Sequence, residues 1–372
     1  MKRWVHRSDG GQGGYLKRKG KFRKLMELRQ CGIHDFKLPV LGIGSWAFGG
    51  GDYWGPCSQA DVNEVVWYAV EHGCNFFDTA EHYYQGGSES SLGRAIKGMD
   101  RSKVVLGSKI SPANTEPHKL VEHCEASLRR LQTDYIDLYM VHWPITPHAI
   151  RSFTTEPMAT PPVSEAFGTL MGLQRAGKIR HIGVSNFGRV KLDEAMATGA
   201  AIAINELPYS LLTRAIEHEI LPYCHSRGVG VLGYMALLQG ILGDVYPTLD
   251  DVPVWQRRTR HFDSRRTPQC RHGLPGAEAE TAAALQAIRL LAQNNGMSTP
   301  ELALKWAIAG KGITSALCGC RTVAKLGPNI KAASEPLSQT LREQLNQVTQ
   351  PLLEQLGPGF DYWENQANDR TQ

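Results

Sequence analysis

Four residues that can hold or move a proton lie at or just after the ends of short apolar runs. Asp78 ends the first of these runs, Tyr83 comes five residues later, and Lys109 and His142 end two further runs. A phenol has a pKa of about 10, and an adjacent ammonium lowers that pKa because it stabilises the phenolate. A carboxylate keeps a buried lysine charged, and a histidine can donate a hydrogen bond to an oxygen that gains negative charge. Together these residues suit general acid catalysis near neutral pH.

Each of these residues also has a structural explanation when it is taken alone. Asp78 suits a turn or a helix cap, His142 a buried histidine with satisfied hydrogen bonds, and Lys109 a lysine whose stem packs on apolar surface. Their joint position at the ends of successive runs favours a shared catalytic site. Tyr84, the next residue along the chain, is the alternative to Tyr83 as the general acid.

A regular alternation of apolar runs and amphipathic segments must position these side chains. The runs predict strands over 37–48, 76–80, 104–110, 135–142, 181–187, 201–207, 228–234 and 314–320. The segments between them predict helices, the first of which Ser58 caps and Gly73 ends. The other helices are predicted over 92–99, 120–131, 166–175, 190–196, 215–224 and 322–333, with two more within 278–310. A small hairpin is predicted over 26–35.

The strands are apolar throughout, which is typical of parallel strands covered on both faces by helices. Eight strand–helix units predict an α/β fold of the (β/α)8 TIM barrel type, with an N-terminal β-hairpin and an additional C-terminal helix. No GxGxxG motif follows the first strand, which disfavours an open doubly wound sheet. In such a barrel the residues that do chemistry lie at the carboxyl ends of the strands. The predicted strand ends carry Asp78, Ser108, Lys109, His142, Ser185, Asn186, Asn205, Glu206 and Tyr234.

Four separated motifs in this chain resemble those of the aldo-keto reductase family. They are Asp78-Thr79-Ala80-x-x-Tyr83, Gly107-Ser108-Lys109, the segment from Tyr139 to Pro144, and the segment from Gly177 to Phe187. The resemblance runs from about Met26 to the helix after Arg321. It implies reversible hydride transfer between a nicotinamide cofactor and a carbonyl group. It also implies a catalytic role for Asp78, Tyr83, Lys109 and His142, and its spacing favours Tyr83 over Tyr84.

The resemblance further implies a set of residues that bind the cofactor. Ser185 and Asn186 match residues that bond the nicotinamide carboxamide, and Tyr234 matches an aromatic residue that stacks on the ring. Glu206 stands where the family often has glutamine, and its carboxylate can accept a hydrogen bond from the carboxamide nitrogen. The expected cofactor contacts also include Gly44, Ser45, Trp46, Leu237, Gln239, Gly319, Arg321, Lys325 and Asn329.

The helix that opens after Gly319 has the N-terminal amides and positive dipole that suit a phosphate. Arg321 and Lys325 fit a 2′-phosphate, which favours NADP(H) as the cofactor over NAD(H). A solvated helix face with no ligand is the alternative explanation of these two basic residues. No metal site is expected.

Several aromatic residues predict an apolar substrate pocket for sugar-like or aryl carbonyl compounds. Trp46, Trp54 and Trp143 are the expected substrate contacts, and Phe48 is expected in the same wall. The segment 146–163 and the tail 357–372 either cap this pocket or lie on the surface as decoration.

Two function classes remain open from the sequence. The first is an NADP-dependent oxidoreductase that reduces aldehydes or ketones to alcohols with Tyr83 as the general acid. The second is a cofactor-binding, redox-sensing regulatory subunit on the same fold, of the potassium-channel β-subunit kind. The expected partner in the first case is a small carbonyl compound or alcohol, and the protein is expected to be a monomer or a homo-oligomer.

Composition and charge limit the remaining possibilities. A hydrophobic content of 42% and a charged content of 21% are typical of a globular protein rather than a disordered one. Nine of the first 25 residues are Lys or Arg, so the chain from Met26 onward is close to neutral, which argues against nucleic-acid binding. Eight scattered cysteines without a repeated spacing predict reduced thiols and a cytoplasmic protein. No apolar run reaches the roughly 20 residues that cross a bilayer.

The expected organisation is a basic leader over 1–25, a barrel over 26–356 and a tail over 357–372. Three explanations of the leader stay open: a start codon assigned too far upstream, with Met26 as the true start, a flexible surface arm, or a targeting peptide.

Overall fold

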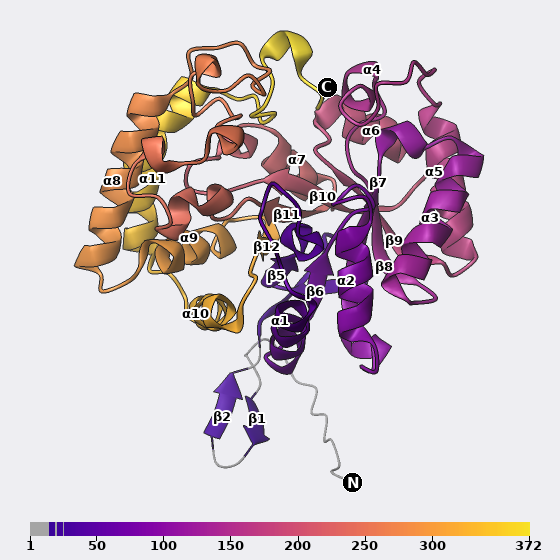
Figure 1. Ribbon diagram of the computed structural model, residues 1–372, viewed down its shortest axis with the longest axis horizontal. Helices are drawn as coiled ribbons and strands as arrows, with labels where there is room; N and C mark the ends of the chain where they lie inside the picture. The colour runs from indigo at the N-terminus through magenta and orange to yellow at the C-terminus, as the bar shows by residue number, and fades with distance from the viewer. Residues whose placement is uncertain (1–14, 19–20, 25) are drawn as a thin grey trace.

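The structure is a computed structural model that describes residues 15–18, 21–24 and 26–372. Its central strands are β5 (Leu41–Gly44), β6 (Phe76–Asp78), β7 (Val105–Ile110), β8 (Ile136–Val141), β9 (Ile179–Ser185), β10 (Ile202–Pro208), β11 (Gly230–Tyr234) and β12 (Ile313–Cys318). They close into a barrel in the order β10, β11, β12, β5, β6, β7, β8, β9 (Figure 1). Each neighbouring pair is parallel, and Ala316 of β12 lies opposite Leu41 of β5. The predicted (β/α)8 barrel is therefore confirmed.

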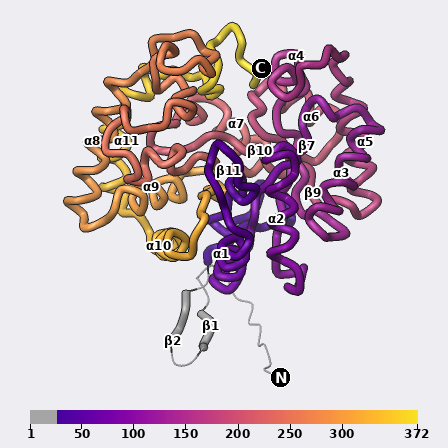
Figure 2. The backbone as a smooth tube through the Cα atoms, in the orientation of Figure 1, coloured from indigo at the N-terminus to yellow at the C-terminus, as the bar shows by residue number. Residues whose placement is uncertain are grey.

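Helices surround the barrel and connect successive strands (Figure 1). They are α1 (Gln59–Glu71), α2 (Gly87–Ile96), α3 (Pro117–Leu131), α4 (Pro147–Ile150), α5 (Val163–Arg175), α6 (Arg189–Ala197), α7 (Ile220–Ser226), α8 (Glu278–Asn294), α9 (Thr299–Ile308), α10 (Val323–Ala333) and α11 (Gln339–Leu356). The predicted additional C-terminal helix is α11, which packs against α8 (Figure 2). No helix in the described part of the chain is long and apolar enough to cross a membrane.

Short 3₁₀ helices occupy several of the connections. They are η1 (Trp46–Gly49), η2 (Arg101–Lys103), η3 (Pro112–Asn114), η4 (Ala215–Glu217), η5 (Leu238–Gly243), η6 (Leu249–Asp251), η7 (Val254–Gln256), η8 (Ser264–Arg266) and η9 (Gln366–Asn368). The long connection between β11 and α8 carries four of these turns, so most of its backbone is irregular.

The predicted first strand, 37–48, is divided in the structure. Its start forms β4 (Lys37–Pro39), which pairs antiparallel with β3 (Leu28–Gln30), and only residues of β5 enter the barrel. The barrel strand ends where the backbone N–H of Ser45 turns to donate to the Asp78 carbonyl at 2.8 Å. The sequence pattern could not separate β4 from β5 because residues 38–44 form one continuous run of apolar residues and glycine.

The β3–β4 hairpin covers the end of the barrel at which the strands begin. Cys31, Phe36 and Leu38 are buried against apolar residues inside the barrel, such as Leu138. The hairpin turn is held by a hydrogen bond from the N–H of Ile33 to the Gly228 carbonyl, just before β11. The opposite end of the barrel is thus the end left for chemistry.

Of the predicted leader, the structure describes only β1 (Tyr15–Arg18) and β2 (Lys21–Lys24), which pair antiparallel. Residues 1–14, 19, 20 and 25 lie outside the described residues. The expectations about the leader therefore stay predictions.

Local sequence explains the helices well, as α1 illustrates. The Ser58 hydroxyl accepts a hydrogen bond from the N–H of Asp61, which satisfies an amide at the start of the helix. Val62, Val65 and Val66 are buried on one face, and each such side chain contributes about 1.5–3 kcal/mol relative to exposure. Gly73, with φ of 81°, follows the end of the helix as predicted.

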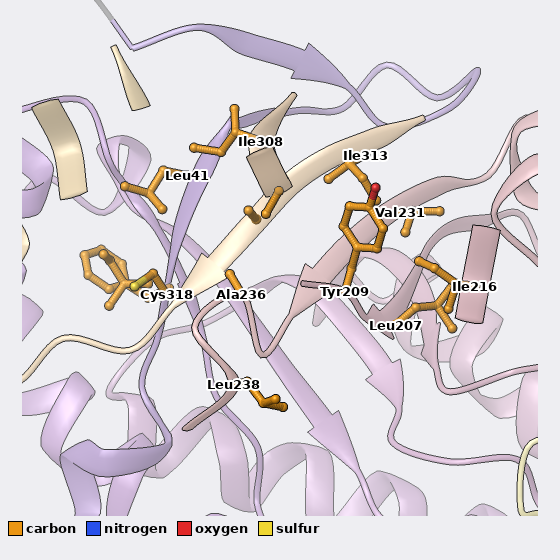
Figure 3. Packing of buried hydrophobic residues seen from close by; sticks show 14 of the residues in the cluster. Leu41, Leu207, Tyr209, Ile216, Val231, Ala236, Leu238, Ile308, Ile313 and Cys318 are labelled. Atoms are coloured by element: carbon orange, nitrogen blue, oxygen red, sulfur yellow. The ribbon is translucent and has the colours of Figure 1, made fainter. Parts of the chain in front are cut away.

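Most of the core lies between the barrel strands and the helices. Figure 3 shows part of this layer, where side chains from β5, β11 and β12 meet residues from the surrounding segments, such as Ile216 and Ile308. All eight cysteines have free thiols.

Candidate active site

The barrel brings the predicted catalytic residues together at the carboxyl ends of its strands. Asp78 ends β6 and lies opposite Gly107, while Lys109 lies two residues further along β7. The Lys109 ammonium contacts both carboxylate oxygens of Asp78, at 2.7 and 2.6 Å, and the Thr79 carbonyl at 3.1 Å. Its Nζ lies 3.2 Å from the Tyr83 hydroxyl. The lysine is completely buried, so these contacts replace its water.

Tyr83 and its alternative, Tyr84, lie in very different places. Only the Tyr83 hydroxyl contacts Lys109, whereas the Tyr84 side chain is 58% exposed. The Tyr84 ring packs against Gly51, where a β-carbon would lie only 2.2 Å from the ring. Tyr84 has φ of 54°, a left-handed backbone that turns it away from Tyr83. The geometry thus supports Tyr83 as the residue that carries the proton.

The Tyr83 pKa differs from the expectation based on sequence. Burial raises the pKa above its usual value, Lys109 lowers it, and the nearby carboxylates of Asp78 and Glu206 raise it. Lys109 thus lowers the pKa of Tyr83 as expected, but burial and the two carboxylates outweigh this effect and the pKa is raised overall. At neutral pH the phenol is protonated, which is the state that a proton donor requires.

Lys109 keeps its charge despite its burial. Burial alone would lower the pKa of Lys109, but the carboxylates of Asp78 and Glu206 hold the pKa above its usual value. The predicted role of Asp78, to pair with the ammonium, agrees with this geometry.

His142 follows β8 and is neutral at physiological pH. Burial, and then the positive charge of Lys109, hold the pKa of His142 well below its ordinary value. Its ring lies edge-on to the Tyr83 ring, with 5.5 Å between the centroids. A neutral imidazole can donate one hydrogen bond, so His142 suits the orientation of a substrate oxygen.

Glu206 brings a second carboxylate to Lys109. Its Oε2 lies 3.3 Å from Lys109 Nζ and has no hydrogen-bond partner among the described residues. Burial and the neighbouring carboxylate of Asp78 raise the pKa of Glu206 to about 8, although Lys109 lowers it. The free buried oxygen leaves room for a ligand with a hydrogen-bond donor.

Ser185, Asn186 and Tyr234 form one polar group beside Glu206. The Tyr234 hydroxyl donates to Asn186 Oδ1 at 2.8 Å, and Asn186 Nδ2 donates to the His142 carbonyl at 3.2 Å. The Ser185 hydroxyl donates to the Glu206 carbonyl at 3.1 Å. Asn186 has φ of 63°, and such strained backbone is common where ligands bind.

The predicted phosphate-binding residues lie at the neighbouring ends of β5 and β12. A β-carbon on Gly44 would lie 3.8 Å from the Gly319 nitrogen, so the two glycine backbones approach without side chains between them. Lys325 is exposed on the first turn of α10, while Nη1 of Arg321 donates to the Trp54 carbonyl at 2.6 Å. Asn329 is buried, and its side-chain amide donates hydrogen bonds to two cysteine sulfur atoms.

Several predicted contacts are engaged within the protein itself. Asn329 Nδ2 donates to the sulfur atoms of Cys318 and Cys320 at 3.3 and 3.1 Å. Ser45 is fully buried, and its hydroxyl donates to the Asp78 carbonyl at 2.5 Å. Ser45 therefore positions Asp78 through the backbone carbonyl of Asp78.

The loop after β5 connects Tyr83 with the predicted phosphate-binding part of the site. The Trp46 ring stacks on Tyr83 and on Tyr53, with centroid distances of 5.7 and 5.1 Å, and meets Trp54 edge-on at 5.2 Å. The Tyr53 hydroxyl donates to Gln239 Oε1 at 2.7 Å, next to Leu237. Tyr53 was not predicted, although its place between two predicted contacts in the sequence was a usable signal.

Two residues of the predicted substrate wall are buried in the structure. Phe48 belongs to the main hydrophobic core. Trp143 is nearly buried, since the Arg370 guanidinium lies 3.8 Å from its ring centroid and Trp363 meets it edge-on at 6.3 Å. In place of Phe48, Phe153 lies beside His142 at 5.5 Å between ring centroids.

The tail 357–372 packs over this end of the barrel rather than standing free. Figure 1 shows the C-terminal segment beside α4, and Arg370 Nη1 donates to Ser152 Oγ at 3.3 Å. Tyr362 is fully buried, and the N–H of Gly188 donates to the Thr371 carbonyl at 2.8 Å. Sequence alone left the position of this tail open.

No group of metal-ligating side chains that could hold an ion occurs in the described part of the chain.

Comparisons with known proteins agree with this geometry. The model of the aldo/keto reductase family matches residues 40–350. The chain is 31% identical over 349 residues to the aldo-keto reductase YhdN of Bacillus subtilis (strain 168), a match that covers 90% of this chain and 97% of that protein. It is 30% identical over 326 residues to the NADH-specific methylglyoxal reductase of Escherichia coli (strain K12), covering 82% and 93% of the two chains.

Solved structures give the same result. An aldo/keto reductase from Klebsiella pneumoniae, in complex with NADP and acetate, has a TM-score of 0.65 at 25% identity and covers 92% of this chain and 98% of its own. The glycerol dehydrogenase of Gluconobacter oxydans has a TM-score of 0.67 at 26% identity, covering 88% and 95%. The family match covers most of the chain and includes Asp78, Tyr83, Lys109 and His142. The protein is thus a member of the aldo/keto reductase family.

Proposed function

We propose that this protein reduces aldehydes and ketones to alcohols with NADPH, and that Tyr83 is the general acid. One observation carries the proposal: Lys109 is held between the Asp78 carboxylate and the Tyr83 hydroxyl, with Nζ 3.2 Å from the phenolic oxygen. An ammonium in that place stabilises the phenolate that remains after the proton has left. A general acid of this kind accelerates a reaction by about 10²–10⁴-fold.

The remaining side chains have complementary roles. A bound reduced nicotinamide supplies the hydride that the carbonyl carbon accepts. His142, neutral and beside Tyr83, donates a hydrogen bond to the carbonyl oxygen, which orients the substrate and stabilises its developing charge. Asp78 keeps Lys109 protonated.

The chemistry of the side chains at the site suits a nicotinamide cofactor. Glu206 Oε2 is a buried acceptor without a hydrogen-bond partner among the described residues, which suits a carboxamide N–H. Ser185, Asn186 and Tyr234 supply polar groups and a flat ring next to it. The bare backbones at Gly44 leave space for a group to approach closely.

The basic residues after β12 favour NADP(H) over NAD(H). Arg321 and Lys325 lie at the start of α10, where a 2′-phosphate gains from charge and from the helix dipole. Two solved relatives from Klebsiella pneumoniae bind NADP or NADPH, whereas one relative is NADH-specific. Measured Kd values for NADPH and NADH test this choice; a preference for NADH would overturn it.

The aromatic side chains around Tyr83 favour small carbonyl compounds with an apolar or sugar-like face. Trp46 and Trp54 lie on one side of Tyr83, while Phe153 lies beside His142. The Trp143 ring also belongs to this wall and packs against the Arg370 guanidinium. Relatives named as methylglyoxal reductases and a glycerol dehydrogenase make small oxygenated aldehydes the first substrates to test.

Optical measurement of NADPH oxidation across a panel tests the proposal. The panel contains methylglyoxal, aryl aldehydes, ketones and open-chain sugars, each with Tyr83→Phe protein as the blank. We expect turnover with at least one small aldehyde. Tight NADPH binding without turnover on any compound would instead favour the redox-sensing subunit, which also needs the cofactor but no substrate.

A further inference from the structure

When it is ionised, Glu206 gives the site around Lys109 one more negative charge than Lys109 can balance. Lys109 has three N–H donors, and its contacts with Asp78, the Thr79 carbonyl and the Tyr83 hydroxyl account for them. Glu206 Oε2 lies 3.3 Å from the same nitrogen but receives no hydrogen bond from the described residues. The second carboxylate therefore stabilises the charge of Lys109 through space, without accepting one of its hydrogen bonds.

The groups that face Glu206 come from four strands and one loop. They are Asp78 on β6, Tyr83 after β6, Lys109 on β7, the Ser185–Asn186 segment at the end of β9 and Tyr234 on β11. Three of them, Asp78, Tyr83 and Tyr234, become anionic when they lose a proton, and among the described residues around Glu206 only Lys109 is a cation. A buried carboxylate without its own counter-ion is costly, so the site gains free energy from a ligand that brings positive charge.

Glu206 also stands between the two halves of the reaction site. Its backbone carbonyl accepts from the Ser185 hydroxyl at 3.1 Å and from the N–H of Asn186 at 2.9 Å. On its other side, Lys109 leads to the Tyr83 hydroxyl, where the substrate oxygen must lie. The carboxylate lies 3.3 Å from the ammonium that contacts the Tyr83 hydroxyl, so its charge acts on the region where the hydride donor and the carbonyl must meet, and burial strengthens its field there.

We propose that Glu206 is a selectivity residue for the redox state of the cofactor: its carboxylate favours the oxidised nicotinamide, which is positively charged, over the neutral reduced form. This inference rests on the proposed use of NADP(H). The two forms of the cofactor carry the same phosphates, so the contributions of Arg321 and Lys325 cancel in the ratio of their affinities. What remains in that ratio is the charge of the ring and its surroundings.

The direction of the effect can be stated for both pH and the reaction. Below a pH of about 8 Glu206 is mostly protonated and discriminates little, and above it the carboxylate is ionised and favours NADP⁺. Carbonyl reduction converts the neutral ring into the charged one within the site. The carboxylate therefore stabilises the product side of reduction and slows release of NADP⁺.

Equilibrium binding of NADP⁺ and NADPH to the Glu206→Gln variant tests the proposal. We expect the affinity ratio of wild-type protein to shift toward NADP⁺ by about tenfold between pH 6 and pH 9, and to stay constant in the variant. Glu217→Gln is the matched control, since Glu217 pairs with Arg214 away from the site. A ratio that is the same in wild type and Glu206→Gln at pH 9, with both cofactors bound, overturns the inference but leaves the proposed function intact.

A measurement on the wild-type protein covers the case in which the variant does not fold. At pH 7, NADP⁺ binding should release up to one proton more than NADPH binding, because the positive ring drives Glu206 to ionise. Calorimetry in buffers of different ionisation enthalpy measures that difference. Equal proton release by the two forms overturns the inference, and failure to bind either form overturns both the inference and the proposed function.

Discussion

Two buried ion clusters lie at the same end of the barrel and differ in how completely their polar atoms are hydrogen-bonded. The Arg370 cluster consists of Arg370, Asp361, Ser152 and the Trp143 ring. Its guanidinium donates to both Asp361 oxygens, at 2.8 and 2.7 Å, and to Ser152, and it covers the Trp143 ring. The Lys109 cluster consists of Lys109, Asp78, Tyr83 and Glu206, and one of its carboxylate oxygens accepts no hydrogen bond from the described residues.

The difference shows that a buried ion pair can stabilise the fold in one cluster and prepare groups for proton transfer in the other. A bidentate arginine–carboxylate pair with every partner supplied fixes the tail in one geometry. An ammonium shared by two carboxylates and a phenol leaves protons that can move and charge that a ligand can compensate. We expect changes in the Arg370 cluster to alter stability, and changes in the Lys109 cluster to alter catalysis and cofactor binding.

The largest expected effect is the loss of catalysis on removal of one hydroxyl. Tyr83→Phe should lower kcat by about 10²–10⁴-fold because the proton donor is gone, while NADPH affinity and the melting temperature stay close to wild type. Steady-state kinetics and a fluorescence titration measure the two properties. Tyr84→Phe is the matched control and should keep full activity. Equal loss in the two variants would transfer the role or remove it from both.

The second effect tests the other side of the comparison. Arg370→Met leaves Asp361 buried without its partner, and the free energy of unfolding should fall by about 3–5 kcal/mol. Urea denaturation measures this loss. Arg265→Met, which removes an arginine that is 87% exposed, should leave the denaturation midpoint unchanged. A stable Arg370→Met protein with a large loss of kcat would show that the two clusters do not divide stability and chemistry as proposed.

Asp78→Asn should have an intermediate effect and sharpen the account of Lys109. The variant removes the carboxylate that accepts two hydrogen bonds from the ammonium, so we expect kcat to fall about 10–100-fold. The pKa of Glu206 should fall as well, because the Asp78 carboxylate no longer raises it. The pH at which NADP⁺ preference appears should then move downward in the binding titration. An unmoved transition would mean that Glu206 and Asp78 titrate independently.

The smallest effect concerns an ion pair that is half exposed. His123 contacts Glu81 at 2.7 Å, just before the catalytic tyrosine loop. The hydrogen bond to Glu81 raises the pKa of His123; burial raises the pKa of Glu81, but hydrogen bonds from His123 and Ser111 lower it overall. The pair therefore stabilises the fold at pH values between the pKa of Glu81 and the pKa of His123. This stability is lost as pH rises through the raised pKa of His123, and it is lost again as pH falls through the lowered pKa of Glu81.

His123→Ala should thus cost about 0.5–1 kcal/mol near pH 6 and less at pH 9. Thermal melts of both proteins at the two pH values provide the measurement. A larger cost at pH 9 than at pH 6 would contradict this assignment.

Local sequence patterns were sufficient for the barrel and for the choice of the residues that we propose as catalytic. Apolar runs and helix caps such as Ser58 depend on neighbours within a few residues, and the ends of parallel strands must share one edge. For this reason Asp78, Tyr83, Lys109 and His142 could be grouped before any coordinates were known. The boundary between β4 and β5 was missed because both strands are apolar and only pairing separates them.

Tertiary structure alone decided the electrostatics and the cover of the site. The raised pKa of Tyr83, the unbonded oxygen of Glu206 and the position of Arg370 over Trp143 each depend on residues from several elements of the fold. Charges and burial act through space, so their sum at one atom is set by the whole fold and cannot be found from any single stretch of sequence.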